Sequence, residues 1–148
     1  MSKRRNFEGL LSLAVSQRDE AARKVAERAD AIRSLDHQLS EIEFRNAEMD
    51  SLRKRASLGE IRMEKLRTAE SIQAALASEQ ARIVEDKKAE QKRLEELHEA
   101  LLRCQQAAKS LEKLQERQSL QERMESEKKE IAALEDWTQQ VFPRSIPS

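Results

Sequence analysis

The sequence has little of what loops, strands and thick protein cores require. Its 148 residues include two glycines, two prolines, three phenylalanines, one tryptophan and no tyrosine. Because turns and sheets draw heavily on these residue types, their scarcity excludes most folds that contain β-strands. Asp, Glu, Lys and Arg make up 38% of the chain. The remaining apolar residues suffice only for a core that is two helices thick.

An excess of charge of one sign is also absent. The 28 lysines and arginines balance 28 aspartates and glutamates, so no global field attracts nucleic acid or a membrane surface. Cys104 is the only cysteine, which rules out a disulfide framework within the chain and suits a reducing compartment. No apolar run approaches the length of a membrane span, and the run near residue 10 is too short for a secretion signal.

Motifs for catalysis and cofactor binding are missing too. Two isolated glycines cannot form a nucleotide-binding loop. His37 and His98 lie far apart, without the cysteine cluster that a metal site would need. Glutamates recur at helical spacing, but a two-helix rod offers no concave pocket that would exclude water. We therefore expect no enzyme activity, no cofactor, no metal and no small-molecule substrate.

The sequence does contain a heptad pattern in two sections. Apolar residues recur in alternating steps of three and four, which places a narrow stripe, here called the seam, along a helix and is typical of coiled coils. The first seam consists of Phe7, Leu11, Ala14, Ala21, Val25, Ile32, Leu35, Leu39, Ile42, Met49 and Ala56. The phase changes at residues 57–59, and the second seam consists of Leu66, Ala69, Leu76, Ile83, Leu94, Leu97, Leu101, Cys104, Ala108 and Leu111.

A chain reversal at the phase change would place the two seams face to face. Facing residues would then have numbers that sum to about 118. The apolar pairs in this register include Phe7 with Leu111, Leu35 with Ile83, Ile42 with Leu76, and Met49 with Ala69. Two polar interruptions also find partners, because Arg28 meets Glu90 and Asn46 meets Gln73. The alternatives are a parallel dimer of one long helix and a disordered chain, and the regular leucines argue against disorder.

The predicted fold class is therefore all-α, a long two-helix antiparallel coiled-coil hairpin with an overhanging C-terminal helix. We expect one domain over residues 1–141, with helix 1 at about 6–56, the turn at about 57–59 and helix 2 at about 58–140, followed by a flexible tail at 142–148. Asn6 is the expected cap of the first helix. Ser57 and Glu60 have capping-box spacing for the second helix, and Gly59 supplies the backbone freedom for the reversal.

The second helix should extend about thirty residues beyond the first. Past Leu111 the apolar pattern changes phase again, where the partner within the chain ends. An apolar stripe without a partner in its own chain indicates a surface for another protein. The candidate partner-binding residues are Leu114, Gln115, Arg117, Gln118, Leu120, Met124, Ile131, Leu134 and Trp137.

The turn region is the second candidate surface, because it is basic. Its candidate contact residues are Arg53, Lys54, Arg55, Arg62, Lys65 and Arg67. Only Glu60 and Glu64 offset them, so the patch could dock an acidic surface, with a solvated end of a coiled coil as the alternative. No aromatic residue is interleaved and no basic fork follows a zipper, so we expect no nucleic acid partner.

Three stretches carry a resemblance to a known family. They are FEGLLSLA at residues 7–14 followed by RDEAAR at 18–23, LEKLQERQ at 111–118, and KKEI to LEDW at 128–137. Their order and positions resemble those in the FliJ family of flagellar type III export, and in the related stalk proteins of injectisomes. The resemblance covers most of the chain.

The resemblance implies a cytoplasmic stalk or escort protein of the export apparatus, peripherally associated with the cytoplasmic face of the inner membrane. It implies three partners: the hexameric export ATPase, whose pore the stalk enters, the cytosolic domain of the export gate membrane protein, and the export chaperones. The overhanging helix would face the ATPase and the basic turn would face the gate. The alternatives are an injectisome stalk protein and a generic cytosolic coiled-coil scaffold.

Overall fold

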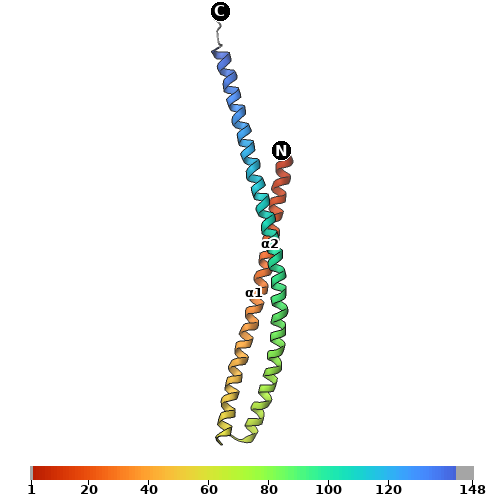
Figure 1. Cartoon of the computed structure of the whole chain (residues 1–148), viewed down its shortest axis with the longest axis vertical. Coiled ribbons are helices and arrows are strands. Elements are labelled where there is room, and N and C mark those ends of the chain that lie inside the picture. The colour runs from red at the N-terminus through yellow and green to blue at the C-terminus, as the bar shows by residue number, and fades with distance from the viewer. Residues whose placement is uncertain (1, 143–148) are drawn as a thin grey trace, which may run out of the picture. The chain divides into compact units, whose positions relative to one another are not determined.

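The computed structural model describes residues 2–142, with side chains from residue 6 onward. Two helices account for nearly all of this range, α1 (Ser2–Ser57) and α2 (Met63–Val141), and no strand occurs in it (Figure 1). The two helices pack against each other as a hairpin, which confirms the all-α fold class. Packing divides the chain into two compact units, residues 18–103 and the described parts of 1–17 with 104–148. The single domain stays a prediction.

The helix ends differ from the sequence-based expectation at two places. α1 begins at Ser2, so Asn6 lies inside the helix and the prediction that it caps the helix was wrong. α2 begins at Met63 and not near residue 58. Its last residue, Val141, agrees with the expected end. Apart from Phe142, the predicted flexible tail lies outside the described residues.

The core of the unit formed by residues 18–103 lies where the two seams meet. Ile42, Leu76 and Ile83 form a buried cluster, and Leu35 and Leu39 pack against it. Each such side chain contributes roughly 1.5–3 kcal/mol relative to its exposed state. The cluster joins the residues that the predicted register pairs, and so the facing of the two seams is confirmed.

Alanines occupy several of the most buried seam positions. Ala69 is 1% exposed in the unit of residues 18–103, and Ala108 is 2% exposed in the other unit, where Ala14 is buried as well. Short side chains at a contact allow two helix axes to approach closely. The buried seam positions therefore include short alanine side chains as well as leucine and isoleucine.

One predicted polar layer is present and one is rearranged. Arg28 Nη1 donates to both carboxylate oxygens of Glu90 at 3.1 Å, as the register predicted. Gln73, in contrast, donates to Asp50 Oδ1 at 2.7 Å and accepts from Arg53 Nη1 at 3.0 Å. The predicted pairing of Gln73 with Asn46 was therefore wrong. Charged groups make stronger hydrogen bonds than a neutral amide does, and both are within reach of Gln73.

The chain reversal depends on Gly59, whose φ is +76°. Its amide donates to the Ala56 carbonyl at 3.0 Å, and the Glu60 amide donates to the Arg55 carbonyl at 3.0 Å. These two bonds form a Schellman motif, which ends a helix by turning one residue into the left-handed region. Gly59 therefore terminates α1.

The predicted capping box for α2 was wrong. Ser57 remains in the last turn of α1, where its Oγ donates to the Lys54 carbonyl at 2.7 Å and satisfies a helix-end acceptor. The Glu60 carboxylate lies 3.6 Å from Arg55 Nε. α2 starts afterwards, with the Arg62 carbonyl accepting from the Lys65 and Leu66 amides.

Candidate interaction surfaces

The C-terminal part of α2 presents an exposed row of apolar side chains. Every side chain from residue 119 to 142 is exposed. We call its apolar seam positions the C-terminal stripe, which consists of Leu120, Met124, Ile131, Leu134 and Val141. Four of them are between 51% and 63% exposed, and Val141 is 47% exposed. So much exposed apolar surface at heptad spacing is typical of an interface that a partner covers.

Two large side chains border this stripe. Trp137 is 57% exposed and lies one helical turn from Leu134. Phe142 lines a shallow hollow together with Ile131 and Leu134. Sequence reasoning singled out Trp137 but missed Phe142, because a residue before a proline was read as part of the tail. Its aromatic character was the available signal.

The predicted partner-binding residues nearest to Leu111 divide into two groups. Leu114 and Arg117 are exposed. Gln115 and Gln118 are half-buried, and they line a narrow groove with Phe7 and with other residues of the same unit. The prediction that α1 covers α2 only as far as residue 111 was therefore wrong. Phe7 and Glu8 of α1 line this groove together with Gln115 and Gln118, so the two helices remain in contact beyond Leu111.

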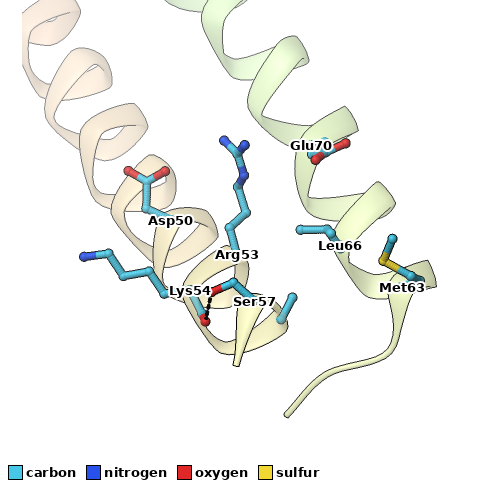
Figure 2. A pocket seen from close by; sticks show the side chains of 8 residues that line it. Asp50, Arg53, Lys54, Ser57, Met63, Leu66 and Glu70 are labelled. Carbon is cyan, nitrogen blue, oxygen red and sulfur yellow. Dashed lines mark hydrogen bonds between the residues drawn. The ribbon is translucent and has the colours of Figure 1, made fainter. Parts of the chain in front are cut away.

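An open groove lies between the end of α1 and the start of α2 in the unit of residues 18–103 (Figure 2). It has a volume of about 670 Å³ and is lined by Asp50, Arg53, Lys54, Ala56, Ser57, Met63, Leu66 and Glu70. Arg53 extends between the two helices in Figure 2, where it donates to Gln73. Two basic and two acidic side chains line the groove, so its own charges balance.

All six basic residues predicted for the turn region are exposed. Arg53 is engaged with Gln73 and Arg55 with Glu60. Lys54 points away from α2 in Figure 2. Gln73 is neutral and leaves the charge of Arg53 in place, so the basic surplus of this region is carried mainly by Arg53, Lys54, Arg62, Lys65 and Arg67.

Apolar side chains also lie at the turn, and sequence reasoning missed them. Leu58 is 74% exposed and Met63 is 67% exposed. Both lie outside the seam. An apolar residue beside a chain reversal was the sequence signal that could have indicated a contact surface there. Their exposure places apolar contact area next to basic side chains, a combination that suits a partner with an acidic and partly apolar surface.

In the part of the chain that the structure describes, no group of three or more His, Cys, Asp or Glu residues could hold a metal ion. Cys104 is a free thiol of intermediate exposure. No helix among the described residues is long and apolar enough to cross a membrane. The two surfaces consist of exposed apolar and charged side chains.

The sequence model of a family described as flagellar FliJ protein matches residues 2–146. The chain belongs to the FliJ family. No curated protein and no solved structure matches it. The family match confirms the resemblance that three short stretches indicated, and it extends over nearly the whole chain.

Membership carries a coarse functional assignment. FliJ family proteins are non-catalytic stalk components of flagellar type III protein export, associated with other components of that apparatus. In this chain the two helices pack as a hairpin, and the C-terminal stripe is exposed.

Proposed function

We propose that this protein enters the pore of the hexameric export ATPase with the C-terminal part of α2, and couples the ATPase to the export gate and the export chaperones. The observation that carries the proposal is the C-terminal stripe, a series of large apolar side chains that the protein's own helices leave exposed. In this proposal, the part of α2 that carries the stripe is the part that meets the ring.

The composition of the stripe suits a contact that must form and release. Apolar positions alternate with polar seam residues, Glu127 and Thr138, and charged residues border both edges. Covering the large side chains would contribute several kcal/mol, roughly 25 cal/mol for each Å² of apolar area removed from water. Much of that gain is offset by the translational, rotational and side-chain freedom that is lost on association. The balance favours a moderate affinity, which suits a stalk that changes its contacts within a ring.

Site-specific photo-crosslinking to the purified ATPase tests this contact. A photoreactive residue at Ile131 should capture the ATPase, because Ile131 lies in the middle of the stripe. The same residue at Asp136, which faces away from the stripe on the same helix, is the matched control and should capture it several-fold less. Equal capture at both positions, or none at either, would contradict docking through the stripe.

The basic surplus at the turn supports a second contact, with the cytosolic domain of the export gate. Lys65 and Arg67 are exposed and make no ion pair with another described residue. Attraction between exposed charges is screened within about 8 Å at physiological salt, so this contact should weaken as salt rises. The double variant Lys65→Glu/Arg67→Glu should bind the purified gate domain at least tenfold more weakly.

A matched charge change elsewhere isolates the role of the turn. Lys24→Glu/Arg33→Glu makes the same change in net charge on α1, away from the turn, and should leave gate binding unchanged. If both double variants weaken binding equally, net charge and not the turn is responsible.

The expected location is the cytoplasm, with peripheral association at the cytoplasmic face of the inner membrane.

The alternative roles are an injectisome stalk protein and a generic cytosolic coiled-coil scaffold. Swimming motility separates them when the protein is expressed in flagellated cells that lack their own FliJ family protein. Restored motility that is lost with Ile131→Asp supports the flagellar stalk. A chain that binds neither the ATPase nor the gate domain, yet forms an elongated parallel dimer, would be a scaffold.

A further inference from the structure

The two edges of the C-terminal stripe carry charges in an ordered pattern. Lys128 and Glu135 border one edge, one heptad apart, and Arg123 and Glu130 border the other edge in the same way. All four side chains are exposed. None of them makes an ion pair with another described residue. In a coiled coil such flanking charges determine which partner binds and in which direction.

A second copy in parallel orientation would bring like charges together. In a parallel pair, each flanking residue meets the flanking residue five positions later on the other helix. Arg123 would then face Lys128 of the second copy, and Glu130 would face Glu135. The Glu127 residues of the two copies would also meet inside the seam. Each of these contacts is repulsive.

A second copy in antiparallel orientation separates these like charges and makes the contacts along one edge attractive. With Ile131 opposite Leu134 of the second copy, the symmetry axis passes between these two residues. Met124 then lies opposite Val141, so the central and outer layers of the stripe are apolar. In this register the flanking positions along one edge pair with each other, which places Lys128 beside Glu135 of the second copy, twice by symmetry.

The polar seam residues of the stripe also pair in this register. Glu127 lies opposite Thr138 of the second copy, so that a hydroxyl donor meets a carboxylate acceptor. The Thr138 hydroxyl donates within its own helix to the Leu134 carbonyl at 2.7 Å, and a rotation about χ1 would redirect it. Both polar interruptions of the stripe therefore have a complementary group in the antiparallel pair, whereas Glu127 meets a like charge in the parallel pair.

We infer that residues 124–141 form an antiparallel coiled coil with a second copy of this chain, centred between Ile131 and Leu134. The helix is already formed before association, so pairing does not include the cost of helix nucleation. Only about two and a half heptads pair, and two of the six layers are polar, so the dimer is weak, with a dissociation constant in the micromolar to sub-millimolar range. The inference does not rest on the proposed function, because it concerns the purified chain alone.

The first test is sedimentation velocity of the full chain over a wide concentration range. The expected result is a reversible monomer–dimer equilibrium. Ile131→Asp should abolish the dimer, because it places a charge beside the symmetry axis. Ala133→Asp makes the same change off the seam and should leave the dimer intact. A chain that stays monomeric up to about millimolar concentration, or a dimer that tolerates Ile131→Asp, would overturn the inference.

Charge reversal tests the direction of pairing. Lys128→Glu and Glu135→Lys should each weaken the dimer about tenfold, since each turns two attractive contacts into repulsive ones. The combination of the two should restore it. The parallel arrangement predicts the opposite, because each single change would remove repulsion and strengthen the dimer. Strengthening by either single change would therefore overturn the antiparallel pairing.

Matched controls and an independent readout complete the design. Lys129→Glu and Asp136→Lys make the same charge changes at positions that face away from the stripe, and neither should alter the dissociation constant more than about twofold. Trp137, the only tryptophan, borders the stripe, so its fluorescence should change on dilution with the same midpoint as sedimentation. A midpoint that differs between the two measurements would place the self-association elsewhere on the chain.

Discussion

Arg28 on α1 reaches across the hairpin to Glu90 on α2, with Nη1 3.1 Å from each carboxylate oxygen. The two side chains are 35% and 26% exposed, so water screens the pair only in part. Both residues occupy seam positions, where a slip of the register would place each charge against apolar groups. The pair therefore favours one register over its neighbours, in addition to whatever stability it contributes.

Reversal of one charge in this pair should destabilise the hairpin, and reversal of both should restore most of the loss. We expect Arg28→Glu to lower the free energy of unfolding by about 1–2 kcal/mol, since two carboxylates then share a partly buried layer. Arg28→Glu/Glu90→Arg should recover at least half of that. Urea unfolding followed by circular dichroism measures both. Strict additivity of the two single changes would show that the residues do not interact.

Truncation of Ile83 should be among the most destabilising single changes in the hairpin. Ile83 is 1% exposed and packs with Ile42 and Leu76. Ile83→Ala should lower the free energy of unfolding by about 2–4 kcal/mol, from lost burial and the cavity that remains. The matched control is Ile131→Ala, at a side chain that is 56% exposed. At a concentration where the chain is monomeric, it should change stability by less than about 0.5 kcal/mol.

The two glycines should respond to alanine with opposite signs. Gly59 has φ +76°, and an added Cβ would meet nothing within 4 Å. Gly59→Ala should therefore cost about 1 kcal/mol from backbone conformation alone. Gly9 lies inside α1, with open space around an added Cβ, so Gly9→Ala should stabilise by about 0.5–1 kcal/mol. Thermal unfolding of both variants checks the prediction, and stabilisation by Gly59→Ala would contradict the Schellman turn.

A local pH effect is expected on the surface of α1. A hydrogen bond from the Arg23 guanidinium to Glu20 lowers the pKa of that carboxyl. A lowered pKa in the folded state means that the ionised form stabilises the fold above the unfolded pKa. That contribution is lost as the pH falls through the folded value. An NMR titration of the Glu20 carboxyl should give a midpoint below the ordinary glutamate value, and Arg23→Gln should raise it. An unchanged midpoint in Arg23→Gln would mean that the bond does not persist in solution.

Sequence periodicity was sufficient to predict that the chain is helical, that it reverses, and that the two seams face each other. These are properties of spacing along one chain: apolar residues in steps of three and four must share a helix face, and two such faces exclude water by packing together. The pairing of Arg28 with Glu90 followed from the same register, because the two positions lie directly opposite each other. The exposed C-terminal stripe was expected on the same basis.

The tertiary structure decided which of several nearby groups each polar side chain contacts. Asn46, Asp50 and Arg53 lie within two turns of one another on α1, and the sequence alone does not show which of them Gln73 on α2 contacts. In the folded chain, Gln73 bonds with the two charged residues, Asp50 and Arg53. Gly59 ends α1 because the amides of the turn find acceptors behind it, an outcome that capping-box spacing cannot reveal. Spacing determines the face on which a residue lies. Hydrogen bonds depend on distances and competing partners, and those exist only once the chain has folded.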